Sequence, residues 1–297
     1  MAENTVQQVP CIFCECKDVN ESYYAKVNFN NKIFEYQQCS NCKLNYNVPL
    51  LNNDDYNALY PLEYHDEYYF LNTKNYTEQL NIVKKAPAIK TILDYGCGDA
   101  GLLKLFFDNG YNCVGIEYNP LLVEKLKKQY SGIRFYSVDE FNALNEQFDC
   151  IHLGDVLEHM VSPIDIIKSL KNKLQPQGYF FIEGPIEHNA SLGHFVRKTA
   201  FSLLKKLRPG RLVQGKPFHT FLANRHNQLQ FFKLMQLQTV YFKVYETAWP
   251  FPDSWKISDG IKLLFEYIVA KISLFFSKII PACGNRFYYL GKMQSSK

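Results

Sequence analysis

The sequence predicts an α/β protein of the doubly wound, Rossmann-like type, in which helices cover both faces of a mostly parallel sheet, together with a small N-terminal cysteine module. From Ile89 onward, short apolar runs of strand length alternate with helical patterns. A glycine-rich turn follows the first of these strands at Asp94–Gly101. Two Cys-x-x-Cys pairs precede the alternating region, at Cys11–Cys14 and Cys39–Cys42.

The alternating region begins a domain that we predict to span 89–297. In a sheet of this type the ligand binds beyond the carboxyl ends of the parallel strands. Asp94, Glu117 and Asp155 all fall at such ends. The expected elements, in order, are strand 91–95, helix 100–109, strand 112–117, helix 119–130, strands 133–137 and 148–154, helix 162–173, strand 179–183, a helix near 224–235 and a strand near 239–247.

The turn after the first strand selects the ligand. Gly96, Gly98 and Gly101 alone satisfy the dinucleotide fingerprint, in which a pyrophosphate lies at a helix N-terminus. However, Asp94 precedes this turn, and a carboxylate there repels a pyrophosphate. S-adenosylmethionine (SAM) instead brings a cationic amino group and a sulfonium. We therefore predict that the turn, including Cys97, binds SAM.

A second acid supports this prediction. Asn112–Glu117 reads as a short apolar strand that ends in an acid about 20 residues after the first glycines. A carboxylate at this place accepts hydrogen bonds from both ribose hydroxyls. NAD-binding proteins also place an acid here, so Glu117 favours SAM over NAD only in combination with Asp94. We add the following Tyr118 to the predicted cofactor contacts.

Further motifs extend the pattern well beyond the glycine turn. Phe148–Asp155 reads as the fourth strand, Val-Leu-Glu-His follows it at 156–159, and Leu-Gln-Pro-Gln-Gly at 174–178 leads into the fifth strand. On these residues the chain resembles the class I SAM-dependent methyltransferases, in the branch of the ubiquinone O-methyltransferases and many sugar methyltransferases. The resemblance covers roughly residues 90 to 250. It implies a seven-stranded sheet whose last strand, expected at 285–290, is antiparallel.

Methyl transfer requires alignment of the acceptor and, for an oxygen or carbanion nucleophile, removal of a proton. His159 and His219 are the candidate bases, because an unperturbed histidine titrates near neutral pH. Asp155 is a candidate for both catalysis and cofactor binding. In the ubiquinone enzymes this run is associated with a divalent metal, which Asp155, Glu158 and His159 would imitate. His159 also reads as a structural residue at a helix start.

The cysteine pairs define a zinc-ribbon-like module at 1–50. Four thiolates from Cys11, Cys14, Cys39 and Cys42 suit tetrahedral zinc. The stretch 22–38 between the pairs alternates enough to form a strand pair. Cys16 is an additional thiol that could replace Cys14. A module with so little apolar core would gain most of its folding energy from the metal.

An aromatic connector follows at 51–88. It contains Tyr60, Tyr64 and Tyr68, and Pro61 interrupts it, which favours short helical turns. Similar methyltransferases carry an aromatic segment here near the mouth of the active site. The resemblance implies that one of these tyrosines touches substrate, although core packing is the favoured explanation.

Composition and charge bound the remaining possibilities. The chain of 297 residues has 47% hydrophobic residues and a formal net charge of +4. Its nine cysteines, several of them inside apolar strands, fit reduced thiols, and no signal-peptide pattern is evident. We therefore expect a cytoplasmic protein, with membrane association left open.

The positive charge is unevenly distributed. Between Glu187 and Glu246 there is no acidic residue, and ten basic ones occur. This basic insertion, which we centre on 186–218, favours an anionic partner: a phosphate-bearing substrate, a membrane surface or RNA. A strongly apolar segment at 257–280 carries Lys262, Glu266, Lys271 and Lys278, so it is expected as a lid or interfacial helix rather than a membrane span.

These observations favour a SAM-dependent methyltransferase whose small acceptor bears phosphate, such as a nucleotide-linked or lipid-linked sugar, with O-methylation preferred. Methylation of RNA is the first alternative, because a zinc ribbon, a basic face and nearby aromatic residues also suit nucleic acid. A non-catalytic zinc-ribbon interaction protein is the second alternative. The intact turn at Asp94 and the acid at Glu117 speak against it.

Overall fold

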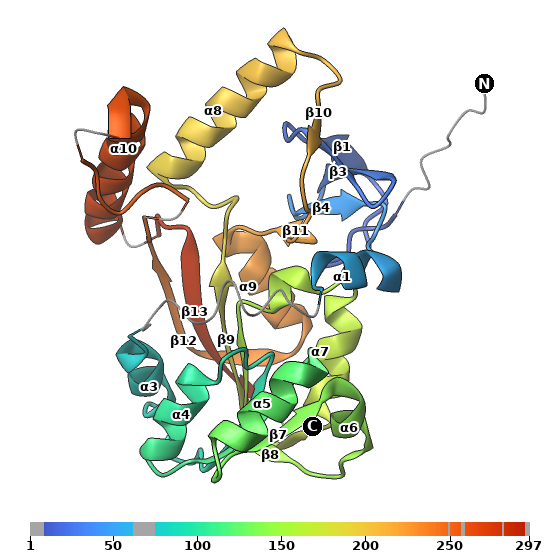
Figure 1. The fold of residues 1–297 in the computed structure, drawn as a ribbon, viewed down its shortest axis with the longest axis vertical. Coiled ribbons are helices and arrows are strands. Elements are labelled where there is room, and N and C mark those ends of the chain that lie inside the picture. Colours follow the sequence, from blue (N-terminus) through green and yellow to red (C-terminus); the bar gives the residue numbers. More distant parts are fainter. Residues whose placement is uncertain (1–8, 62–74, 249, 257–258, 281, 295–297) are drawn as a thin grey trace. The chain divides into compact units, whose positions relative to one another are not determined.

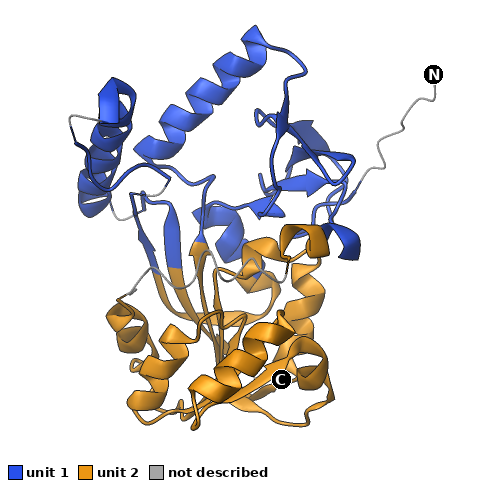
Figure 2. Ribbon diagram, viewed as in Figure 1, with its two compact units in different colours: residues 1–55, 185–231, 243–287 blue, residues 56–184, 232–242, 288–297 orange. Residues whose placement is uncertain are grey.

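The computed structural model describes residues 9–61, 75–248, 250–256, 259–280 and 282–294 (Figure 1). The chain forms two compact units, and each is assembled from segments that are distant in sequence (Figure 2). Unit 1 comprises residues 1–55, 185–231 and 243–287. Unit 2 comprises residues 56–184, 232–242 and 288–297.

Unit 2 contains most of a seven-stranded sheet with the order β12-β13-β9-β8-β5-β6-β7. Its central strands are parallel, and their buried residues form near-continuous apolar runs, as expected for a sheet covered on both faces. These strands are β5 (Thr91–Tyr95), β6 (Asn112–Glu117), β7 (Arg134–Ser137), β8 (Phe148–Gly154) and β9 (Leu174–Pro185).

The two remaining strands, β12 (Leu237–Tyr245) and β13 (Arg286–Met293), confirm the predicted antiparallel element. The Gln294 amide donates to the Gln236 carbonyl, whereas the Asn285 amide donates to the Tyr245 carbonyl, so the two strands run in opposite directions. The Ile186 amide likewise donates to Asn285 at the far end of β9. The last strand of the chain, β13, therefore lies between β9 and β12 in the sheet. The predicted seven-stranded α/β fold is confirmed.

The helices of this region follow the amphipathic pattern. In α4 (Gly101–Asp108) the buried residues are Leu102, Leu103 and Phe106, at the spacing of one helix face. The other helices are α3 (Thr77–Val83), α5 (Pro120–Gln129), α6 (Val138–Ala143) and α7 (Pro163–Lys171), with a short 3₁₀ helix, η1, at Leu157–His159.

Two elements differ from the prediction. No element is predicted from the sequence between β7 and β8, but Ser137 and Glu140 form a reciprocal capping box that begins α6. The fifth strand was expected at 179–183, yet β9 begins at Leu174, which pairs with Phe148. A register shift lies in this stretch, where Gln177 has a φ of 63°, so the proline-glycine sequence forms an irregularity in the strand instead of ending it.

Unit 1 contains a second sheet, of six strands, in the order β10-β2-β3-β4-β11 with β1 paired to β3. The predicted strand pair between the cysteine pairs is present as β2 (Lys26–Phe29) and β3 (Lys32–Cys39). The other members are β1 (Val19–Glu21), β4 (Asn45–Val48), β10 (Leu212–Gln214) and β11 (Phe221–Leu222).

The basic insertion is therefore part of the same sheet as the cysteine module. Leu212 pairs with Lys26, and Phe221 pairs with Tyr46, across more than a hundred residues of sequence. The chain also contains α1 (Asn53–Leu59), α8 (Leu192–Leu207), α9 (Arg225–Leu234) and α10 (Gly260–Ile279), the last within the predicted apolar segment. The predicted boundaries at residues 50 and 88 stay predictions.

Candidate active site

The glycine turn at the end of β5 has the geometry that its sequence predicted. Gly96 has a φ of +83°, and a Cβ atom there would lie 2.6 Å from Cγ2 of Val156. The amides of Gly96 and Cys97 both donate to the carbonyl of Ile116 in the neighbouring strand. Only glycine fits this backbone conformation and this close approach without strain.

Glu117 lies at the end of β6, beside the turn. One carboxylate oxygen accepts a hydrogen bond from the Gly98 amide at 3.0 Å. The other accepts from the amides of Tyr118 at 2.8 Å and Asn119 at 3.2 Å. Because β5 and β6 are parallel neighbours, Asp94 and Glu117 meet at the same edge of the sheet. Backbone amides thus orient Glu117, and the pairing of β5 with β6 places Asp94 at the same edge.

The sequence did not indicate a buried histidine, His152, which lies between two carboxylates. Its Nδ1 is 2.7 Å from Oδ1 of Asp94, and its Nε2 is 3.3 Å from Oε1 of Glu183. The side-chain amide of Gln79 donates to both Glu183 oxygens, at 3.1 and 3.3 Å. All four residues are less than a tenth exposed. They form one buried polar network, which includes the acid directly before the glycine turn.

The charge of this network follows from its geometry. Burial disfavours a charged imidazole, but the carboxylates of Asp94 and Glu183 outweigh burial and raise the pKa of His152 to about 10. Near neutral pH the ring is therefore protonated and donates from both nitrogens. Asp94 consequently does not face the cofactor turn as an isolated charge, because one of its oxygens is already paired.

The network also requires a small neighbour. A Cβ atom at Gly154 would lie 2.6 Å from Cε1 of His152, so the end of β8 accommodates the ring only with glycine at this position. The missed signal was the histidine within the buried run 150–153 of this strand, whose other members are apolar. A titratable residue in the middle of a buried strand requires a partner, but its identity depends on the strand order.

The other predicted cofactor contacts occupy different environments. Cys97 is buried, and burial raises the pKa of its thiol. The Gly101 amide donates to the Asp99 side chain, and the Tyr118 hydroxyl donates to Asn57. Asp155 is exposed, with a φ of 54°, and its amide donates to the Glu183 carbonyl.

His159 is held by two tyrosines of the connector. Its Nδ1 is 2.8 Å from the Tyr60 hydroxyl, and its backbone carbonyl accepts from the Tyr56 hydroxyl. Its Nε2 is 3.7 Å from the buried carboxylate of Glu158. Of the three connector tyrosines singled out above, Tyr64 and Tyr68 lie outside the described residues. A divalent metal held by Glu158, His159 and Asp155 stays a prediction.

His219 has a carboxylate partner in unit 1. Its Nδ1 is 2.7 Å from Oε2 of Glu187, and its backbone carbonyl accepts from the Tyr36 hydroxyl and the Asn47 side chain, both at 2.8 Å. A carboxylate on Nδ1 fixes the tautomer that leaves Nε2 as an acceptor. Glu187 was overlooked in the sequence because it appeared only as the boundary of the basic stretch.

The four predicted cysteines come together. Their sulfur atoms all lie within 4.8 Å of one another, with Cys11 and Cys42 at 3.6 Å and Cys14 and Cys39 also at 3.6 Å. Tetrahedral zinc with Zn–S bonds of about 2.3 Å requires sulfur separations of roughly 3.8 Å. Cys16 lies outside this group and approaches Asp18 and Ser40 instead. The donor set and its spacing fit a zinc ion.

The two cysteine pairs also share one backbone form. Glu15 and Lys43, each directly after the second cysteine of its pair, have φ values of 57° and 63°. The Glu15 amide donates to the Cys11 carbonyl, and the Lys43 amide donates to the Cys39 carbonyl. Equivalent turns at both pairs aim four thiols at one point.

Residues 66–238 match the family model described as a methyltransferase domain. This match covers more than half of the chain and includes the glycine turn, the acid at the end of β6 and the β8 region. The chain therefore belongs to the methyltransferase-domain family, and its fold is that of the class I SAM-dependent methyltransferases.

Curated relatives narrow this class only in part. A ubiquinone biosynthesis O-methyltransferase from Actinobacillus pleuropneumoniae is 34% identical over 103 residues, which are 31% of this chain and 44% of the relative. A ubiquinone biosynthesis O-methyltransferase from Yersinia pestis is 25% identical over 154 residues, 46% of this chain and 63% of the relative. The chain spans about half the length of these curated relatives.

Among solved structures, a SAM-dependent methyltransferase from Methanosarcina mazei is 14% identical and superimposes with a TM-score of 0.49, over 73% of this chain and 98% of that one. A likeness of this degree bears on neither the acceptor nor the catalytic residues.

Proposed function

We propose that the protein transfers a methyl group from SAM to a small acceptor that bears phosphate, such as a nucleotide-linked or lipid-linked sugar, and that the acceptor atom is oxygen. The observation that carries this proposal is the glycine turn between two acids at the carboxyl ends of adjacent parallel strands, in a methyltransferase-type sheet. When bound, SAM supplies a methyl carbon activated by a sulfonium leaving group.

The cofactor would contact Asp94, Gly96, Cys97, Gly98, Gly101, Glu117, Tyr118 and Asp155. Glu117 is positioned by three backbone amides at the end of β6, where its carboxylate would accept hydrogen bonds from the ribose hydroxyls. Asp94 keeps one oxygen on His152 and offers the other to the amino group. His152 is thus a positioning residue, because it acts on the cofactor through Asp94.

Proton removal falls to His219 in this proposal. Glu187 holds Nδ1, so the lone pair on Nε2 accepts the proton of the acceptor hydroxyl as the oxygen forms its new bond. The carboxylate then stabilises the imidazolium. His159, whose Nδ1 is engaged by Tyr60, is the alternative base, and Asp155 is the remaining catalytic candidate.

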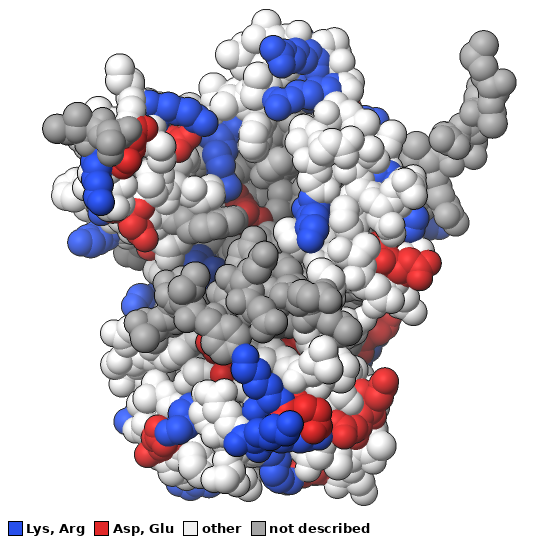
Figure 3. All heavy atoms as spheres, in the orientation of Figure 1, with Lys and Arg blue, Asp and Glu red and all other residues white. Residues whose placement is uncertain are grey.

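Two observations support the acceptor class. Curated relatives are named as O-methyltransferases, which favours an oxygen acceptor. The interval without acids between Glu187 and Glu246 favours an anionic one. On the face drawn in Figure 3, basic side chains gather over α8, which belongs to that interval.

We also propose that zinc bound by Cys11, Cys14, Cys39 and Cys42 has a structural role. Four sulfur ligands fill the tetrahedral coordination sphere and leave no position for a substrate. The ion would link the segment before β1 to the turn that joins β3 to β4.

The cofactor assignment is tested by calorimetric titration of the protein with SAM. Asp94→Ala removes the carboxylate but leaves His152 and Glu183 without their partner, so Asp94→Asn is measured beside it, with thermal melting to establish that both variants fold. We expect binding by the native chain and loss of at least tenfold in affinity for a folded variant. Absence of binding by the native chain would refute the proposal.

The acceptor class is tested by transfer of labelled methyl from SAM into fractionated cell extract. We expect label in the nucleotide-sugar or solvent-extracted lipid fraction. Label confined to RNA would replace the proposed acceptor with a nucleic acid, while the cofactor assignment would stand.

A further inference from the structure

The helix α10 carries an apolar stripe that the described residues leave uncovered. Positions spaced by three or four residues form one helix face, and in α10 six large residues of one such face are at least 40% exposed. The most exposed member reaches 85%. The stripe consists of Ile261, Phe265, Ile268, Ile272, Phe275 and Ile279.

The opposite face attaches α10 to unit 1. Its buried residues are Val269, Ala270 and Ser273, and the Ser273 hydroxyl donates to Glu246 at 2.6 Å. Glu266, which is the acid of this helix, lies one turn before Ala270 on the attached side. The helix is therefore fixed by its small and polar face, and the large apolar face is directed outward.

The neighbouring helix α8 repeats this arrangement. Among its 16 residues only Gly193 is buried. Phe201 packs against Tyr24 with ring centroids 5.9 Å apart, and Lys205 pairs with Glu21 at 2.6 Å, so this side meets the sheet of unit 1. Phe195, Leu203 and Leu207 are 65%, 55% and 68% exposed on the remaining surface.

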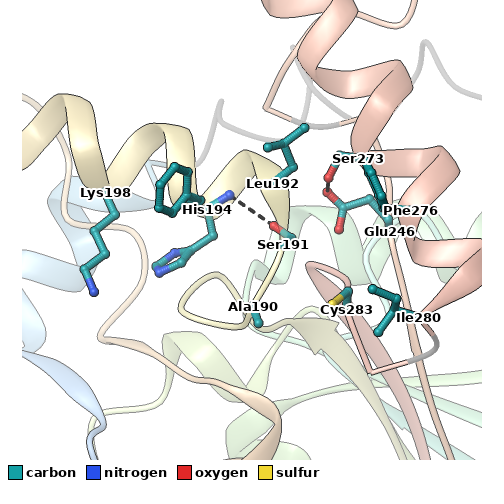
Figure 4. Close-up of a pocket in the computed structure, with 11 residues that line it drawn as sticks. Ala190, Ser191, Leu192, His194, Lys198, Glu246, Ser273, Phe276, Ile280 and Cys283 are labelled. Atoms are coloured by element: carbon teal, nitrogen blue, oxygen red, sulfur yellow. Dashed lines mark hydrogen bonds between the residues drawn. The ribbon is translucent and has the colours of Figure 1, made fainter.

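A recess of about 380 Å³ lies between the two helices (Figure 4). Phe195 of α8 and Phe276 of α10 line it, together with Ile280 just after α10, and all three are also substantially exposed. Figure 4 shows Lys198 at one side of this recess and Glu246, paired with Ser273, at the other. The recess thus brings exposed apolar residues of both helices together, and Phe276 and Ile280 each stand one residue from a member of the α10 stripe.

Three of the four charged side chains of α10 are lysines, and the fourth, Glu266, pairs with Lys262 at 3.8 Å, while Glu246 in the recess accepts from the Ser273 hydroxyl. Lys271 and Lys278 stand one residue from members of the α10 stripe, and Lys198 and Lys206 are exposed on α8, which has no acidic residue. Apolar side chains bordered by lysines are the pattern of a helix that lies in the interface of a membrane containing anionic lipids. Among the helices that the structure describes, none has the length and apolar character needed to cross a bilayer.

We propose that the outward faces of α8 and α10 form a docking surface for the surface of an anionic bilayer. The apolar stripe enters the boundary between headgroups and acyl chains, and the lysines beside it contact the lipid phosphates. This inference is independent of the proposed methyl transfer, because vesicle binding requires no acceptor.

The test is flotation of the full chain with phosphatidylcholine vesicles that contain phosphatidylglycerol, compared with vesicles of phosphatidylcholine alone. We expect flotation with the anionic vesicles and little with the neutral ones. Phe265→Ser/Phe275→Ser/Ile279→Ser changes only residues that are at least 57% exposed, so it should fold normally by circular dichroism and fail to float.

Charge is tested by Lys271→Gln/Lys278→Gln, which should lower partitioning into anionic vesicles about 30-fold. Lys84→Gln/Lys128→Gln removes the same charge from two exposed lysines of unit 2 and should float like the native chain. The proposal would be overturned by equal flotation with both vesicle types or by an equal loss of flotation in both lysine variants. It would also be overturned if the protein retains RNA but does not float, or if it is a dimer by ultracentrifugation and does not float.

Discussion

The two compact units of this protein are stabilised differently. In unit 2, Ile92, Leu93, Val114, Ile116 and Ile151 in three adjacent parallel strands are fully buried, so burial of apolar surface is the main source of stability. In unit 1, α8 buries one residue and α10 buries three, while four cysteines and several long-range strand pairs connect its segments. Unit 1 buries Phe34, Tyr46 and Phe231, but its two long helices add little to this core, so we expect removal of a specific link to affect it strongly.

Removal of the metal should show the difference in stability between the two units most clearly. Chelation, or Cys39→Ser, should unfold the cysteine module of unit 1, because a structural zinc site contributes on the order of 10 kcal/mol. Unit 2 should keep its secondary structure. Limited proteolysis read by mass spectrometry would show early cleavage in 9–55, and Cys16→Ser, a nearby thiol outside the cluster, is the control. Elemental analysis with clearly less than one zinc per chain would contradict the site.

The second prediction concerns the buried network of unit 2. His152→Gln leaves the carboxylates of Asp94 and Glu183 buried without a cation, which should cost about 3–5 kcal/mol of unfolding free energy. Because the folded pKa of His152 is raised to about 10 from 6.5, its stabilisation is complete below about pH 6.5 and is lost as pH rises through about 10.

Urea unfolding of the native chain and the variant across this range checks both statements. His226→Gln, at an exposed histidine, is the control. If the difference between the native chain and His152→Gln does not narrow as the pH rises towards 10, the ring does not carry the charge assigned to it.

The third prediction concerns catalysis. His219→Ala should lower turnover by about 10²–10⁴-fold, the range of a general base, with little change in SAM affinity. Glu187→Gln should lower turnover less, because Nδ1 keeps a hydrogen-bond partner. Steady-state kinetics with calorimetry would measure both, with His226→Ala as the control. An equal loss of SAM affinity in His219→Ala would assign His219 a structural role.

The smallest expected effect is a test of packing. Gly154→Ala places a methyl group 2.6 Å from His152, so the ring or β8 must shift at a cost of about 1–3 kcal/mol. Gly215→Ala in unit 1 meets Val27 at an ordinary 3.7 Å and should change stability little. The melting temperatures of the two variants test this difference. Equal values would show that β8 accommodates the added methyl group without loss of stability.

The sequence predicted unit 2 more completely than unit 1 for a physical reason. Apolar runs of strand length, the glycine turn before Gly101 and the acid at Glu117 are local signals, and the structure contains the elements that they predict. The six-residue helix α6 was not predicted from the sequence, because its start depends on a capping pair instead of an apolar pattern. The strand at Leu212–Gln214 was not predicted either, because its partner, β2, lies far away in the sequence.

The sequence by itself determined the α/β alternation and the family, and it predicted two sites, the glycine turn and the cysteine pairs, because apolar periodicity and fixed spacings of glycine, acid and cysteine act over short distances. Only the tertiary structure decided that His152 bridges Asp94 and Glu183, and that Glu187 holds His219. Such pairs join side chains from separate strands and loops. Their energy depends on burial and on distances of about 3 Å, which no spacing along the chain specifies.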